Sequence, residues 1–78
     1  MSQRISNIPL RKYRKFLEYI KCDCNRTKGG HEHWSRADLS RPITLQTHID
    51  PVPEFIIKQH LRYLNMTRGN FLKAISEV

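Results

Sequence analysis

Apolar side chains recur at helical spacing near the start of the chain and predict an amphipathic helix over residues 9–21. Its apolar positions are Leu10, Tyr13, Phe16, Leu17 and Ile20. Basic side chains occupy the opposite face, and Pro9 suits the first turn of a helix. Ser6 or Asn7 can supply the cap, and we expect the polar residues 1–6 to be frayed.

A β-hairpin is predicted next, because residues 22–28 read as an extended segment and residues 31–35 as its return strand. The Gly-Gly pair at 29–30 can adopt the positive φ values of a tight two-residue turn. Apolar and polar positions alternate over residues 43–49, which predicts a third, half-buried strand.

A Pro-rich break at residues 50–53 separates this strand from two further helices. The first is expected over residues 54–64, with its core side formed by Phe55, Ile56, Ile57, His60, Leu61 and Leu64. Asn65 can end this helix, and Thr67 can cap a short last helix. The apolar side of that last helix is Phe71, Leu72 and Ile75.

The order α-β-β-β-α-α predicts a single α+β domain spanning residues 1–78. A three-stranded antiparallel sheet with the helices on one face is the simplest arrangement that buries these apolar stripes. This is a double-stranded-RNA-binding-domain-like topology. It leaves the second face of the sheet uncovered, and on a basic chain such a face is a natural docking surface for nucleic acid.

The chain is strongly basic, with 14 Lys and Arg against 7 Asp and Glu over 78 residues. Residues 1–41 hold 10 of those basic residues and 4 of the acidic ones. Such a surface attracts polyanions, because neutralising phosphates releases counterions. No apolar run has the length of a membrane span or of a signal peptide. We therefore expect a cytoplasmic protein with no membrane contact and no small-molecule cofactor.

The two cysteines, Cys22 and Cys24, are separated by one residue, a spacing that strains a disulfide. With His31 and His33 they form a C-x-C…H-x-H set, but zinc sites usually separate paired cysteines by roughly two to four residues. We expect both cysteines to be small core residues, with no bound metal. A structural zinc and a catalytic thiol are the alternatives.

The densest group of candidate functional residues surrounds the predicted glycine turn. In a two-residue hairpin, Lys28 lies opposite His31 and Arg26 lies opposite His33, all on one face of the sheet. Two cations beside two imidazoles form a phosphate site with an acid/base group built in. This combination suits RNA cleavage, because RNA carries its own nucleophile, the 2′-hydroxyl, and the protein must only move protons and stabilise charge.

The same register conflicts with the expected core. It places Cys22 and Cys24 on the His31 face and Trp34 on the other face. If both cysteines and Trp34 are core residues, the strand needs a bulge or the loop is longer than two residues. We expect Trp34 in the core, although it could also stack a base. His48, on the third strand, could face the same surface as His31.

The segment Arg26-Thr27-Lys28-Gly29-Gly30-His31, followed by the aromatic Trp34, resembles the Lys-Gly-Ser/Thr-His segment of HicA toxins. These are small bacterial mRNA interferases of type II toxin–antitoxin pairs. The other elements follow in similar order: a preceding amphipathic helix, a strand ending at His48-Ile49, a Pro-rich break, a helix at 55–61 and a closing turn and helix. The resemblance covers about residues 9–76.

This resemblance implies a metal-independent endoribonuclease that cleaves mRNA and inhibits translation, with His31 as its general acid or base. Arg26 and Lys28 would be the phosphate partners. The further expected RNA-binding residues are Gly29, Gly30, His33, Arg11 and Lys15. The resemblance also implies a partner, a HicB-like antitoxin that covers the active site. Gly30 stands where the family commonly has Ser or Thr, so a hydroxyl contact to phosphate is absent here.

Two other functions fit these residues. A non-catalytic RNA-binding module of the same fold predicts binding that survives the loss of His31 and weakens steeply with salt. A protein-interaction subunit, whose basic face meets an acidic partner, predicts tight protein binding with little affinity for RNA.

Overall fold

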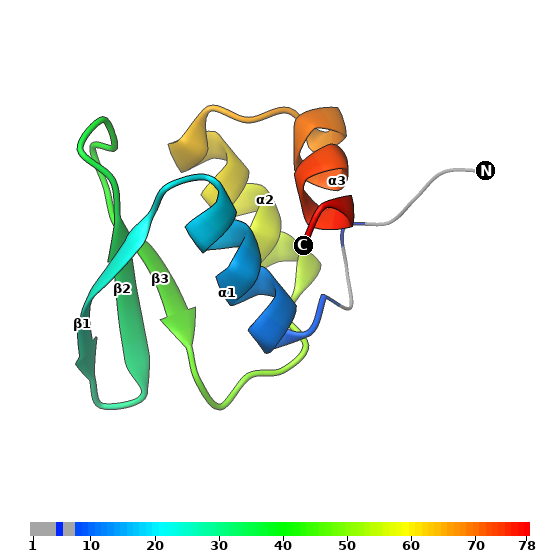
Figure 1. Ribbon diagram of the computed structural model, residues 1–78. Coiled ribbons are helices and arrows are strands. Elements are labelled where there is room, and N and C mark those ends of the chain that lie inside the picture. The colour runs from blue at the N-terminus through cyan, green and yellow to red at the C-terminus, as the bar shows by residue number, and fades with distance from the viewer. Residues whose placement is uncertain (1–4, 6–7) are drawn as a thin grey trace.

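The computed structural model of the chain describes residue 5 and residues 8–78 (Figure 1). These residues form an α+β structure with three helices and three strands in the order predicted from the sequence. The elements are α1 (Leu10–Tyr19), β1 (Asp23–Lys28), β2 (His31–Ser35), β3 (Ile43–Gln46), α2 (Glu54–Leu64) and α3 (Arg68–Ser76). The strands form one antiparallel sheet in the order β1-β2-β3, and the helices lie to one side of it.

The start of α1 is capped from a distant part of the chain. Pro9 occupies the N-cap position and offers no side-chain hydrogen bond. Instead, Asp50 in the loop before α2 accepts a hydrogen bond from the backbone N–H of Leu10, at 3.0 Å from Oδ1. The predicted caps, Ser6 and Asn7, lie outside the described residues.

The expectation that residues 1–6 are frayed is wrong for Ile5, the one residue of that segment that the structure describes. Its side chain is 2% exposed and belongs to the hydrophobic core. The Ile5 side chain is apolar, and its burial is favourable because it removes apolar surface from water. Residues 1–4 and residue 6 lie outside the described part of the chain.

The hairpin between β1 and β2 has the predicted two-residue turn. Gly29 and Gly30 have φ values of 56° and 80°, which suit the positive φ required at both positions of a type I′ turn. The pairing places Lys28 opposite His31, as the sequence predicted. It also brings Arg26 opposite His33, which confirms the predicted register.

A bulge in β1 resolves the conflict between the regular hairpin register and the expected core residues. The register shifts between Cys24 and Arg26, so that Asn25 is the extra residue, and Cys24 lies opposite Trp34. Trp34 is buried as expected, whereas Cys24 is exposed and the expectation of a core position was wrong. Every residue of β1 is exposed, and this strand forms one edge of the sheet.

The third strand is shorter than predicted and ends at Gln46 rather than Ile49. The chain turns after Gln46, and both the backbone N–H and the side-chain hydroxyl of Thr47 donate to the Gly30 carbonyl, at 2.8 and 3.1 Å. These bonds hold the segment after β3 against the hairpin turn.

The hydrophobic core lies between one face of the sheet and the helices. Tyr13, Phe16 and Leu17 of α1 are fully buried, and Phe16 meets Phe71 of α3 edge-on, with ring centroids 4.8 Å apart. The sheet contributes Trp34, Ile43 and Leu45, and α2 contributes Ile57, Leu61 and Leu64.

Phe55 was expected on the core side of α2, but it is 70% exposed. It precedes the buried Ile57 by two residues, and two helical steps rotate a side chain by roughly 200°, nearly to the opposite face. Among helices formed by the described residues, none is long and apolar enough to cross a membrane.

One buried polar pair joins α1 to α2 inside the core. The Tyr13 hydroxyl lies 2.7 Å from His60 Nδ1, and His60 is 3% exposed. Burial lowers the pKa of His60 to about 4, against the opposing effect of a backbone hydrogen bond to Thr44 in β3. Burial also raises the pKa of Tyr13, and the charge of Cys22 adds to the same effect. Both side chains of the pair are therefore neutral near pH 7.

Protonation of His60 is expected to destabilise the fold in mild acid. Because its folded-state pKa of about 4 is below the ordinary value of 6.5, the unfolded chain takes up the proton first as the pH falls. The free energy of unfolding should therefore fall by up to about 1.4 kcal/mol per pH unit from pH 6.5 to pH 4, with no such contribution above this range. Urea unfolding of wild type and His60→Gln across this range measures the difference. Parallel pH profiles for the two proteins would contradict the prediction.

Candidate functional site

The sheet face that points away from α1 carries a group of polar side chains that we call the histidine face. It consists of Arg26 and Lys28 on β1, His31 and His33 on β2, and Thr44 and Gln46 on β3. Side chains alternate between the two faces along a strand, so these residues share one face. The intervening residues of β2, Glu32 and Trp34, point to the opposite face, toward α1 and the core.

The strand register places both imidazoles in the middle of the histidine face. His31 lies between Lys28 on β1 and Gln46 on β3. His33 lies between Arg26 and Thr44 in the same way. Directly opposed side chains on one face have Cβ atoms roughly 4.5–5.5 Å apart, so each histidine has a basic residue as its immediate cross-strand neighbour.

The surroundings of the two histidines differ. The hydroxyl of Thr44 lies 3.4 Å from Nδ1 of His33, a long hydrogen bond that orients this ring. Both imidazoles are half-buried, whereas Arg26 and Lys28 are exposed. Between described residues, no side-chain hydrogen bond uses the His31 imidazole, so both of its nitrogens are open to a ligand.

A third imidazole lies beside the hairpin turn. A Cβ atom placed on Gly30 would lie 3.9 Å from His48 Nδ1 and 3.6 Å from Thr47 Oγ1. His48 is therefore beside the glycine that precedes His31, and it is exposed. Whether the His48 side chain shares the face of His31 stays a prediction, and the bonds from Thr47 to Gly30 hold the neighbouring backbone at the turn.

A hydrogen-bonded cluster on the other side of β2 holds the strand against α1. Glu32 accepts from Arg14 Nε at 3.1 Å and from Arg14 Nη2 at 2.9 Å, and it accepts from Trp34 Nε1 at 3.1 Å. Burial of Glu32 acts to raise the pKa of its carboxyl, but the hydrogen bonds from Arg14 and Trp34 outweigh that effect and the pKa is lowered. These hydrogen bonds thus fix the position of Glu32, which lies between His31 and His33 on β2.

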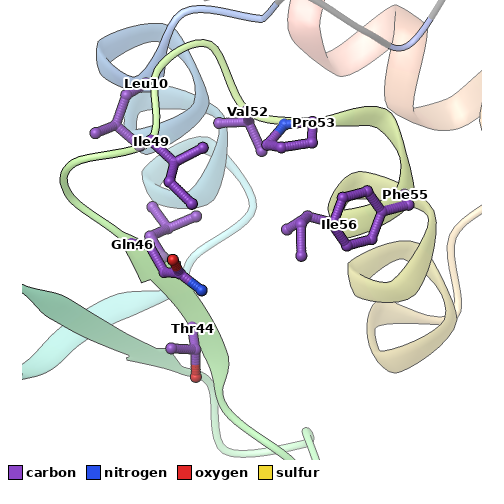
Figure 2. Close-up of a pocket in the computed structure, with 9 residues that line it drawn as sticks. Leu10, Thr44, Gln46, Ile49, Val52, Pro53, Phe55 and Ile56 are labelled. Carbon is purple, nitrogen blue, oxygen red and sulfur yellow. The ribbon is translucent and has the colours of Figure 1, made fainter.

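An apolar pocket of about 80 Å³ lies between the end of β3, the loop after it and the start of α2. In Figure 2, Thr44 and Gln46 lie on the strand side, and Phe55 and Ile56 lie on the helix side. Leu10, Ile49, Val52 and Pro53 complete the lining that the figure labels. The exposed Phe55 ring is therefore part of this pocket and not of the core.

Two predicted site residues are not brought to the histidine face. Arg11 and Lys15 are exposed on α1, which packs against the opposite side of the sheet.

Cys22 is buried in the core, and burial is the main cause of its raised pKa. Within the described part of the chain, no three His, Cys, Asp or Glu side chains are grouped to hold a metal ion.

Three contributors to the site were not identified from the sequence, which are Thr44, Gln46 and the hydrogen-bonded cluster around Glu32. Thr44 and Gln46 could have been found, because they alternate with the buried Ile43 and Leu45 and must therefore face outward. The contact between Glu32 and Arg14 could not have been found from the sequence, because the two residues are 18 positions apart and no local pattern pairs them.

Glu32→Gln is expected to lower the free energy of unfolding by about 1–2 kcal/mol, because an amide cannot accept two charge-assisted hydrogen bonds from Arg14. Glu18→Gln, at an exposed position of α1, is the matched control and should change stability by less than about 0.5 kcal/mol. Denaturant unfolding at pH 7 measures both variants, and equal effects would refute the assigned role of Glu32.

Gly30→Ala is expected to destabilise the hairpin by about 1–2 kcal/mol, because an L-residue at a φ of 80° is strained. Its added Cβ meets only ordinary contacts, so the backbone conformation and not a clash is the cause. Gly69→Ala in α3 is the control, and it should leave stability unchanged or raise it by up to about 1 kcal/mol. Thermal unfolding of both variants tests whether Gly30→Ala lowers the stability while Gly69→Ala does not.

Comparisons with known proteins add no family assignment to this geometry. No protein-family model, no curated protein and no solved structure matches the chain.

Proposed function

We propose that the protein is a HicA-like, metal-independent endoribonuclease that cleaves mRNA and thereby inhibits translation. The observation that carries the proposal is the hairpin register. It aligns Lys28 with His31 and Arg26 with His33 on a sheet face that none of the described helices covers. The first five elements, α1-β1-β2-β3-α2, follow the order of double-stranded-RNA-binding domains, which agrees with binding of an RNA backbone on this domain.

The two exposed cations suit a phosphate backbone. Arg26 and Lys28 are two residues apart on β1, so their side chains project from the same side of the hairpin. A phosphate held by these groups is brought within reach of the histidines opposite them. The carboxylate of Glu32, on the neighbouring strand β2, is bound by Arg14 on the other face and does not compete for these cations.

The reaction follows from the chemistry of RNA. The 2′-oxygen attacks the adjacent phosphorus, a bond from that oxygen to phosphorus forms, and the bond to the leaving 5′-oxygen breaks. One imidazole takes the proton from the 2′-hydroxyl, and a second acid donates a proton to the 5′-oxygen. His31 performs one of these transfers. His33 and His48 are the neighbouring imidazoles available for the other.

The products of this route are a 2′,3′-cyclic phosphate and a 5′-hydroxyl. Arg26 and Lys28 stabilise the charge that develops on the phosphate oxygens. Gly30 provides no hydroxyl to this phosphate, so at this position the contact that the family commonly makes through Ser or Thr is missing. The site of action is the cytoplasm, and the regulatory partner is a HicB-like antitoxin that covers the histidine face.

His31→Ala is expected to reduce the cleavage rate of an end-labelled mRNA at least about 100-fold in the presence of EDTA, because general acid–base catalysis supplies a factor of that order. Lys73→Ala, which removes an exposed cation from α3 on the helix side, should cleave like wild type. Analysis of the product ends should show the cyclic phosphate and the 5′-hydroxyl.

Three results would count against the proposal. Products with a 3′-hydroxyl and a 5′-phosphate would require attack by water. Equal cleavage by wild type and His31→Ala would place the activity in other residues or in a contaminant. RNA retention on a gel by both proteins, without cleavage by either, would identify a non-catalytic RNA-binding module.

A further inference from the structure

A second hollow adjoins the histidine face and has different chemistry. It has a volume of about 300 Å³ and lies between β3 and α2. We call it the amide groove, lined by Arg41, Thr44, Gln46, Ile56, Gln59 and Tyr63. None of the residues that the structure describes along this hollow is acidic.

The amide groove shares two residues with the histidine face. Thr44 and Gln46 line the groove, and they are the β3 partners of His33 and His31. The hydroxyl of Thr44 also contacts the His33 ring at 3.4 Å. A nucleotide whose phosphate lies at the histidines therefore has this groove directly beside it, across one strand.

The lining of the groove suits a flat, polar ring. The Arg41 guanidinium carbon lies 5.6 Å from the centroid of the Tyr63 ring, so a cation and an aromatic ring are stacked at one end. Unstacked bases bind on aromatic side chains and on guanidinium planes of this kind. Gln46 and Gln59 add two amides, and each amide can both donate and accept hydrogen bonds.

The floor of the groove is a packed part of the fold. His60 lies on it and is buried, with its ring bound to the Tyr13 hydroxyl at 2.7 Å. Gln59 and Tyr63 are four residues apart on α2, so they project from the same side of the helix. The groups that would contact a ring are thus held by a packed helix and a strand.

We propose that the amide groove is a nucleobase subsite that holds the base next to the scissile phosphate, an inference that rests on the proposed ribonuclease function. Gln46 and Gln59 read the edge of the base, and Tyr63 with Arg41 stacks its face. A base within a duplex cannot enter such a groove, because it is paired and stacked. The substrate is therefore single-stranded RNA, cleaved with a base preference at one position beside the cut.

Binding to the subsite can be measured without cleavage. The probe is a set of single-stranded RNA pentamers that differ only in the central base, titrated into ¹⁵N-labelled His31→Ala protein. The side-chain amide signals of Gln46 and Gln59 should shift, and one base should shift them at lower RNA concentration than the other three. A duplex of the same sequence should leave these signals in place. Amide signals that do not move with any pentamer would overturn the subsite.

Cleavage specificity gives an independent readout. Gln59→Ala should reduce the base preference in a randomised single-stranded RNA pool by roughly tenfold while cleavage continues, since loss of a bidentate base contact has about this effect. Asn70→Ala removes an exposed amide from α3 and should keep the wild-type preference.

The two proposals can fail separately. If wild type cleaves RNA and Gln59→Ala and Tyr63→Leu keep its base preference, the subsite is wrong and the ribonuclease function stands. If wild type does not cleave RNA, the ribonuclease function is wrong. The pentamer titration then decides the subsite: shifted Gln46 and Gln59 amides support it, and unshifted amides overturn it.

Discussion

The pairing register of β1 and β2 is the constraint on which the rest of the structure depends. Side chains alternate along a strand, so a slip of one residue would exchange the core face and the outer face. Gly29 and Gly30 set the register by accepting positive φ values that few other residues tolerate. The bulge at Asn25 then allows Cys24 to pair with Trp34 while Arg26 pairs with His33.

Two polar contacts, one partly buried and one fully buried, tie the helices to the sheet from different directions. Glu32 binds Arg14 and thereby holds β2 against α1, directly behind the histidine face. His60 binds Tyr13 and makes a backbone hydrogen bond to Thr44, which holds α2 beside β3. The first contact supports the strand that carries the histidines, and the second supports the floor of the amide groove. The outer polar surfaces are therefore built on ordered elements although they are open to solvent.

Local sequence patterns were sufficient to predict most of the fold. The spacing of apolar residues in α2 gave its bounds, and Asn65 ends that helix in the left-handed conformation that such a residue tolerates. The Thr67 side chain caps α3 by accepting from the Asn70 backbone N–H at 3.1 Å, as expected. The same reasoning found the hairpin register, because glycine pairs and alternating side chains act over a few residues.

Contacts between distant residues could not be predicted in this way. The cap of α1 comes from Asp50, which is 40 positions from Leu10. Ile5 was assigned to a frayed segment, because a single apolar residue has no periodic neighbours that would indicate its burial. Phe55 was assigned to the core because it is apolar, although its angular position on α2 points it away. The side of the sheet on which Arg11 and Lys15 lie also depends on how α1 packs, and no local pattern contains that information.

The central claim is that the histidine face cleaves RNA through the 2′-hydroxyl of the substrate. The most direct test uses a single-stranded RNA that wild type cuts at a mapped position, compared with the same RNA carrying one 2′-deoxynucleotide on the 5′ side of that bond. The account predicts that the substituted RNA binds with similar affinity and is not cut at that bond, because its nucleophile is missing. Cleavage of both RNAs at the same rate would contradict the account.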